Sequence, residues 1–241
     1  MKAMRLPGRA LLLIAAALGV IGALMAPHLY KRLEIAPLFH EVLGIDVSNH
    51  QGDIDWKAVA ADLVAFAYIK ATEGGDFRDA RFQRNWNDAK AAGIPRGAYH
   101  FFTQCRSGAD QAANFIRTVP KEAGALRHVV DAEHMGPCPP GRRFPDVRGE
   151  LLAFMSGVEA HYGRRPLVYV TEEFDRVHLA GHFTGETFWV RSLFWPPGIR
   201  KQNWLLWQYH HRGERSGIKG PVDLNAFRGS RGEFLAFAGL K

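Results

Sequence analysis

The chain has 241 residues, 47% of them hydrophobic, and a formal net charge of +7. The first 42 residues carry five basic and two acidic side chains, so the remaining part is only mildly basic. Such an excess fits an anionic polymer as a partner and equally fits an ordinary basic surface, and no segment resembles a nucleic-acid-binding module. No internal repeat interrupts the roughly 200 residues after this segment, which suffice for one domain with a full hydrophobic core.

The N-terminal segment has the pattern of a membrane signal. Lys2, Arg5 and Arg9 precede an uncharged apolar run of 17 residues, Ala10 to Ala26. This length is short for a membrane-spanning helix and long for a signal-peptide core. We therefore predict a cytoplasmic basic segment (1–9), a transmembrane signal anchor in the inner membrane (10–26), a stalk (27–42) and a periplasmic domain (43–241). The alternative is a cleaved signal peptide and a secreted protein.

From Leu43 onward, short apolar segments alternate with helical ones. The predicted strands are Leu43–Val47, Leu63–Ala71, Gly97–Phe102, His128–Glu133, Leu167–Val170, Thr187–Val190, Trp204–Gln208 and Val222–Leu224. The predicted helices are Trp56–Ala61, Ala80–Ala92, Gly108–Val119, Val147–Tyr162 and one near Arg231–Ala238. This alternation indicates a parallel sheet with helices outside. We therefore predict an α/β fold, an irregular TIM-like (β/α) barrel of eight strands whose second half lacks helices because the later strands are too close together.

Two carboxylates end the predicted strand His128–Glu133. Asp131 and Glu133 are two residues apart, so in a strand their side chains lie on one face, about 6–7 Å apart. Acids at the end of a buried strand are costly to keep charged, and their repulsion raises the pKa of one of them. A protonated acid beside an ionised partner is the arrangement used in glycoside hydrolysis, although two solvated strand-end acids would show the same pattern.

The barrel prediction also locates the other functional residues. The loops after the carboxyl ends of barrel strands build the site, and each predicted strand ends in polar or aromatic residues. Aromatic faces stack on sugar rings and carboxylates hold hydroxyl groups, so the set predicts a sugar-binding cleft. The expected substrate-binding residues are Asp46, Tyr99, Tyr169, Trp189, Gln208 and Asp223. We expect Lys70, Glu73 and His100, at the same strand ends, to belong to a buried network.

Cys105 and Cys138 each follow a predicted strand by a few residues. Neighbouring strands would place these two loops side by side, and in an oxidising compartment a pair of cysteines is more often bridged than free. We therefore predict a disulfide between them. Two cysteines make a zinc site improbable, and we expect no metal at the site.

Six motifs follow one another along the chain: Gly44–Ser48 with Gln51, Gly52 and Trp56 after it, Ile69–Gly74, Gly97–Phe101, Asp131–Glu133, Leu206–Tyr209 and Val222–Asn225. Together they resemble the glycoside hydrolase family 25 lysozymes, the Chalaropsis-type N-acetylmuramidases, from Gly44 to about Phe237. A lone Asp-x-Glu motif would be weak, whereas six in order are specific. The departures are small: Ala132 replaces a larger aliphatic residue, Arg191 replaces a small one, and the Cys138-Pro139-Pro140 loop is not general.

The resemblance implies hydrolysis of the β-1,4 bond between N-acetylmuramic acid and N-acetylglucosamine in peptidoglycan, without a cofactor. By position and by resemblance, Glu133 is the general acid. Asp131 either attacks the anomeric carbon or orients the substrate's 2-acetamido group, which then attacks. We favour the second route, because direct attack requires carboxyl groups about 5–5.5 Å apart and the substrate carries acetamido groups.

Two alternatives to a muramidase are kept at this stage. One is a catalytically silent barrel that binds peptidoglycan, and the other is a hydrolase of another acetamido-sugar polymer. The complete set of acids at the strand ends disfavours the silent barrel, because binding alone does not require a buried acid beside an ionised one. The expected partners are peptidoglycan glycan strands, and the expected oligomeric state is a monomer.

Overall fold

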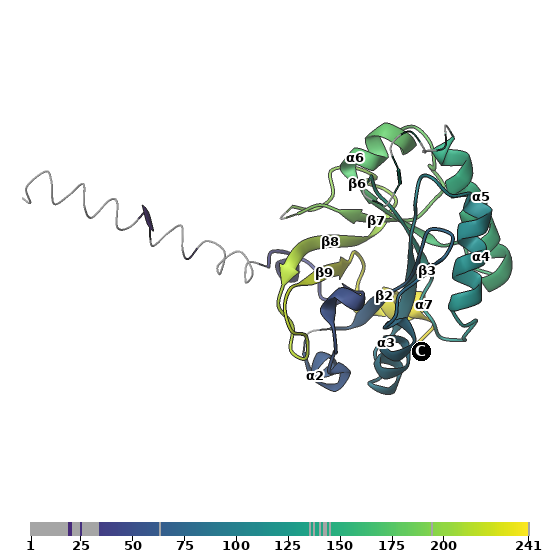
Figure 1. Ribbon diagram of the computed structural model, residues 1–241. Coiled ribbons are helices and arrows are strands. Elements are labelled where there is room, and N and C mark those ends of the chain that lie inside the picture. The colour runs from purple at the N-terminus through teal and green to yellow at the C-terminus, as the bar shows by residue number, and fades with distance from the viewer. Residues whose placement is uncertain are drawn as a thin grey trace, which may run out of the picture. The chain divides into compact units, whose positions relative to one another are not determined.

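The computed structural model describes residues 34–240 except 63, 135, 137, 140, 142, 143, 145 and 194, and before them residues 19, 20 and 25. From Glu34 onward the chain is one compact unit, built around a β-barrel (Figure 1). Eight strands close the barrel in the order β1, β2, β4, β5, β6, β7, β8, β9, and β9 pairs back onto β1. Their bounds are β1 Leu43–Val47, β2 Phe66–Glu73, β4 Arg96–Phe101, β5 Val129–Ala132, β6 Leu167–Thr171, β7 Phe188–Arg191, β8 Trp204–Gly213 and β9 Val222–Phe227.

The sheet is mixed, and the prediction of an all-parallel sheet is wrong for β9. This strand runs antiparallel to both β8 and β1, whereas the other barrel neighbours are parallel. Only residues 214–221 join β8 to β9, and a parallel crossover needs a dozen or more residues. A short additional strand, β3 (Phe77–Arg78), pairs with the end of β2 outside the ring.

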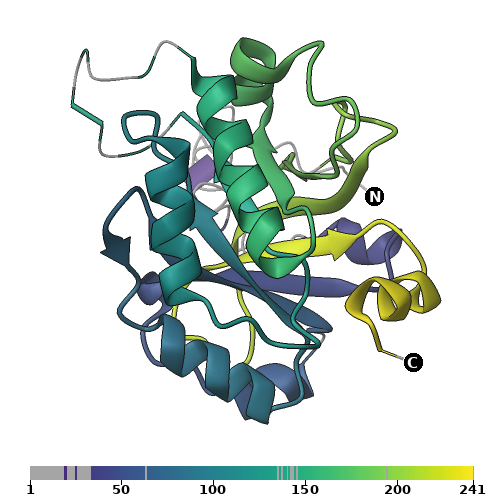
Figure 2. The ribbon, with the colours of Figure 1, turned by 90° about the vertical axis from the view of Figure 1, so that its right-hand side faces the viewer.

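Helices cover the first half of the barrel. They are α2 Trp56–Ala61, α3 Phe82–Ala91, α4 Gly108–Thr118 and α5 Val147–Tyr162, and α7 Arg231–Ala238 follows β9. Helices α4 and α5 lie side by side outside the strands (Figure 2). The remaining turns are short: η1 Ala36–Leu38, η2 Asn49–Gln51, α6 Glu172–Phe174 and η3 Asp175–Leu179. Between β7 and β9 the described residues contain no helix, as the strand spacing predicted.

Local sequence explains where the helices begin and end. The Ser107 hydroxyl accepts a hydrogen bond from the Asp110 backbone N–H at 3.1 Å and begins α4, which is the usual role of an N-cap serine. Gly163 ends α5 with a φ of 75°, a left-handed conformation that glycine adopts without a steric penalty.

Side chains alternate between the helix layer and the barrel interior along each strand. On β1, Ile45 and Val47 pack toward the helices. On β2, Phe66 and Tyr68 belong to a second cluster that fills the inside of the barrel. We call this cluster the floor; its main members are Phe66, Tyr68, Val129, Leu167, Leu206 and Phe227, all fully or almost fully buried. A Cβ on Gly44 would come within 2.4 Å of the Phe66 ring, so this position leaves no room for a side chain.

The transmembrane helix predicted for residues 10–26 is not supported. In the part of the chain that the structure describes, no helix is both long enough and apolar enough to cross a bilayer. Apart from residues 19, 20 and 25, that prediction lies outside the described residues, as does the basic segment 1–9. Residues 34–42, expected in a stalk, pack on the barrel: Ala36 and Val42 are buried, and Glu34 forms an ion pair with Arg215 at 2.6 Å.

Candidate active site

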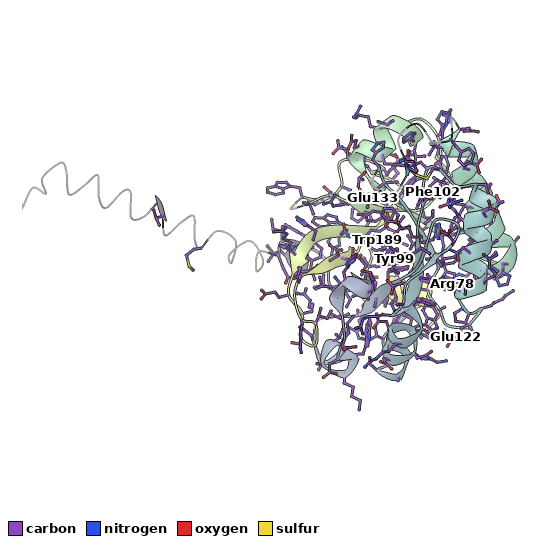
Figure 3. All side chains as sticks on the ribbon, in the orientation of Figure 1. Arg78, Tyr99, Phe102, Glu122, Glu133 and Trp189 are labelled. Carbon is purple, nitrogen blue, oxygen red and sulfur yellow. A yellow bond between two sulfur atoms is a disulfide. The ribbon has the colours of Figure 1, made fainter. Side chains whose placement is uncertain are left out.

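A pocket of about 360 Å³ opens above the floor, at the carboxyl ends of the parallel strands and at the amino end of the antiparallel β9. All eight predicted site residues line it: Asp46, Tyr99, Asp131, Glu133, Tyr169, Trp189, Gln208 and Asp223. Figure 3 shows Glu133, Tyr99 and Trp189 close together in this region, with Glu122 well away from them. We call the charged residues of the pocket the mouth: Asp46, Lys70, Asp131, Glu133, Arg191 and Asp223.

Asp131 and Glu133 lie at and just beyond the end of β5, on the face that points into the pocket. Burial raises the pKa of Asp131 well above its ordinary value, and the negative charges of Glu133 and Asp46 raise it further. Burial also raises the pKa of Glu133, against the opposing charge of Arg191. One carboxyl oxygen of Asp131, Oδ1, is buried and has no hydrogen-bond partner among the described residues. The acceptor capacity of this oxygen is therefore unused among the described residues.

Asp46 and Asp223 face each other across the antiparallel β1–β9 pair. Burial is the main reason why the pKa of each is raised, and for Asp223 the charge of Asp46 adds to it. Asp46 Oδ2 accepts hydrogen bonds from Gln208 Nε2 at 3.1 Å and from Asn225 Nδ2 at 2.8 Å. Two carboxyl groups in contact share a proton more readily than they both ionise. We therefore expect one of these two carboxyl groups to stay protonated.

The aromatic residues of the pocket are held in fixed orientations. The Tyr169 hydroxyl donates to Gln208 Oε1 at 2.9 Å, and Trp189 Nε1 donates to Asn225 Oδ1 at 2.9 Å. Trp189 is only 2% exposed and its ring lies 5.1 Å from the Tyr68 ring. Trp189 therefore joins the pocket to the floor, and its buried ring lacks the open face that a sugar-stacking platform needs.

Lys70, Glu73 and His100 belong to two separate polar groups, and only His100 is fully buried as the sequence predicted. Lys70 Nζ lies 2.7 Å from Glu73 Oε2. His100 is fully buried, its Nδ1 lies 2.7 Å from the Thr72 hydroxyl and its Nε2 lies 3.1 Å from Gln111 Oε1. Burial lowers the pKa of His100 to about 3. His100 is therefore neutral and structural, while Lys70 places a positive charge in the pocket.

The predicted disulfide between Cys105 and Cys138 is confirmed, with 5.6 Å between the Cα atoms. It joins the loop after β4 to the loop after β5. Beside it, Gln104 Nε2 donates to the backbone carbonyl of Glu133 at 3.3 Å. The two loops therefore hold the backbone of Glu133 from outside the pocket.

Sequence reasoning did not place some residues in the site. His50, Gln51 and His211 also line the pocket. Arg191 and Asn225, which the sequence places at strand ends, contribute as well: Arg191 lines the pocket, and Asn225 supports Asp46 from β9. His50 and Gln51 come from η2, whose position no periodicity predicts.

Known proteins are similar to this chain in fold and in sequence. Residues 45–218 match the model of Glycosyl hydrolases family 25. The chain is 36% identical to the uncharacterized protein YegX of Escherichia coli K12, covering 85% of this chain and 76% of that one, and 36% identical to Lysozyme M1 of Streptomyces globisporus, covering 82% and 71%. A family 25 glycosyl hydrolase from Bacillus anthracis has a similar structure, with a TM-score of 0.75, 37% identity and coverage of 83% and 94%. The chain therefore belongs to glycoside hydrolase family 25.

Proposed function

We propose that this glycoside hydrolase is a lysozyme that cleaves the β-1,4 bond between N-acetylmuramic acid and N-acetylglucosamine in peptidoglycan. The observation that supports this most is the mouth, where four carboxyl groups with raised pKa values meet in one open pocket. Family membership and the similarity to Lysozyme M1 support the same substrate. Because peptidoglycan lies outside the cytoplasmic membrane, we propose that the enzyme acts in the cell envelope, as a monomer.

Glu133 is the general acid of the proposed mechanism. Its raised pKa keeps a proton on the carboxyl group at a pH where an ordinary glutamic acid has lost it. Glu133 gives this proton to the glycosidic oxygen as the bond from that oxygen to the anomeric carbon breaks. In the second step Glu133, now ionised, removes a proton from the water molecule that attacks the same carbon.

Asp131 assists the substrate's own nucleophile. The acetamido oxygen of the muramoyl unit attacks the anomeric carbon, and the acetamido N–H donates to Asp131. The buried and unpartnered Oδ1 of Asp131 supports this role. Direct attack by Asp131 is the alternative route, and both routes retain the configuration of the anomeric carbon. A covalent glycosyl-aspartate detected by mass spectrometry would favour direct attack.

The proposed substrate-binding residues are Asp46, Asp223, Tyr99, Tyr169, Trp189 and Gln208. Asp46 lines the pocket and is held in place by two amide donors. Asp223 is partly exposed and can accept from a sugar hydroxyl. The Tyr169–Gln208 hydrogen bond fixes the wall against which the sugar would lie.

Analysis of the digest ends tests the proposal. Purified sacculi are digested, the new reducing ends are reduced with borodeuteride, and the fragments are examined by mass spectrometry. A muramidase leaves labelled muramitol. Labelled glucosaminitol would show cleavage of the other bond, and the absence of any new reducing end would favour a binding barrel without catalysis.

A further inference from the structure

Arg191 ends β7 and lies at the level of Glu133. Strand pairing places Asp131, Tyr169 and Trp189 at one level of the barrel. Side chains of a strand return to the same face every second residue. Glu133 and Arg191, each two residues further along, therefore lie one step nearer the solvent, on the inward face of β5 and β7.

The guanidinium group of Arg191 is unpaired in the described part of the chain. Lys70, the other lysine or arginine that lines the pocket there, is bound to Glu73 at 2.7 Å. The guanidinium group of Arg191 makes no hydrogen bond or ion pair with a described side chain, although the residue is partly buried. Burial is the largest cause of the raised pKa values of Glu133 and Asp223 and of the lowered pKa of His211. The positive charge of Arg191 lowers the pKa of all three groups. The charge of Arg191 therefore acts on these three groups, while its guanidinium forms no ion pair with Glu133 or Asp223.

An arginine in this position is suited to an anionic ligand. The planar guanidinium binds a carboxylate through two parallel hydrogen bonds, a geometry that lysine does not reproduce. N-acetylglucosamine carries no carboxyl group. N-acetylmuramic acid carries a lactyl carboxyl group, and where a peptide stem is attached to it the stem carries carboxylates of its own.

We propose that Arg191 binds a carboxylate on the muramoyl side of the substrate and so selects muramoyl glycans. This inference rests on the proposed function. The carboxylate has two sources, the free lactyl group of a peptide-free glycan and the stem peptide. Arg191 is then a specificity-determining residue that acts beside the acid–base pair.

Three glycans separate these sources. Intact sacculi carry stem carboxylates, amidase-stripped glycan carries free lactyl carboxylates, and stripped glycan amidated with carbodiimide and ammonia carries neither. The wild type is compared with Arg191→Ala and Arg191→Lys by kcat/KM. Arg212→Ala is the matched control, because Arg212 is exposed on β8 and does not line the pocket. Circular dichroism checks that each variant is folded.

For wild type we expect a preference for a carboxylate-bearing glycan over the amidated glycan. In Arg191→Ala this preference falls by about 10- to 100-fold, the range for a charge-assisted hydrogen bond, mainly through KM. Arg191→Lys recovers part of the preference, and Arg212→Ala keeps it. A loss confined to stripped glycan identifies the lactyl carboxylate as the ligand, and a loss confined to intact sacculi identifies the stem.

Two results would overturn the inference. One is an equal loss on all three glycans. The other is a shifted pH profile of kcat with an unchanged preference, which would make Arg191 a residue that adjusts the pKa of Glu133. Neither result concerns the reaction itself. If the wild type released no muramic acid at new reducing ends, the proposed function would fail instead.

Discussion

At the floor of the barrel the Phe66 ring packs 6.2 Å from Tyr68 and 5.5 Å from Phe234, whereas at the mouth Asp46 and Asp223 face each other with raised pKa values. The same strands build both regions. β2 passes from Phe66 and Tyr68 to Lys70, and β5 passes from Val129 to Asp131. Along each of these strands, a floor residue that stabilises the fold is followed two residues later by a mouth residue. The mouth residue lowers stability and provides the chemistry.

The difference shows where the free energy of folding is gained and where it is used. Burying an aromatic side chain at the floor is favourable by a few kcal/mol. Confining carboxyl groups at the mouth is unfavourable, and their raised pKa values measure that cost. The buried aromatic and aliphatic side chains of the floor therefore offset the cost of the carboxyl groups at the mouth.

Glu133→Gln should have the largest effect, because it removes the proposed acid and keeps the shape of the mouth. We expect kcat to fall by about 10²- to 10⁴-fold, the usual contribution of a general acid, with little change in thermal stability. The measurement is the release of reducing ends from sacculi. Glu173→Gln, at an exposed position outside the pocket, is the control. Undiminished lysis by Glu133→Gln would remove Glu133 from the mechanism.

Phe66→Ala tests the floor. The side chain is fully buried, and such truncations cost about 3–5 kcal/mol of the free energy of unfolding. Urea unfolding measures the loss, and Phe66→Leu should lose less because it leaves a smaller cavity. A loss below about 1 kcal/mol would mean that the floor does not support the barrel.

Replacing both cysteines by serine loosens the two loops behind Glu133. The disulfide closes a loop with a sequence separation of 33 residues, and we expect the free energy of unfolding to fall by about 2–4 kcal/mol. The comparison is made between oxidised wild type, reduced wild type and the double variant. If oxidised wild type and the variant unfold at the same temperature, the bond contributes nothing to stability.

Asp223→Asn should change stability less than Phe66→Ala or the loss of the disulfide, and in the opposite direction. Since the folded state raises the pKa of Asp223, the protonated form is favoured by folding. Stability from this group is complete below the unfolded pKa near 3.8 and is lost as the pH rises toward the folded value. At pH 8 the variant should melt higher, by about 2–4 °C for each kcal/mol regained, and cleave more slowly. At pH 3 the two should melt alike. Asp76→Asn is the control, because the carboxyl group of Asp76 is exposed. A lower melting temperature for Asp223→Asn at pH 8 would contradict the inferred cost of keeping Asp223 ionised in the folded state.

Much of this arrangement could be read from residue patterns. The alternation in β5 placed Asp131 and Glu133 on one face, and the loops after β4 and β5 predicted the disulfide. The contact between Asp46 and Asp223 depends on the antiparallel direction of β9, which the sequence did not reveal because ending the preceding strand at Gln208 left a connection long enough for a parallel crossover. The continuation of β8 to Gly213 was missed because His210, His211 and Arg212 do not follow an apolar alternation.

The acid role of Glu133 can be tested directly with an N-acetylmuramoyl glycoside whose leaving group is 2,4-dinitrophenolate. This group departs without being protonated, whereas the sugar hydroxyl of the natural substrate requires an acid. We predict that Glu133→Gln loses about 10²- to 10⁴-fold in the bond-cleaving step on glycan and far less in the release of dinitrophenolate. An equal loss on both substrates would contradict the account.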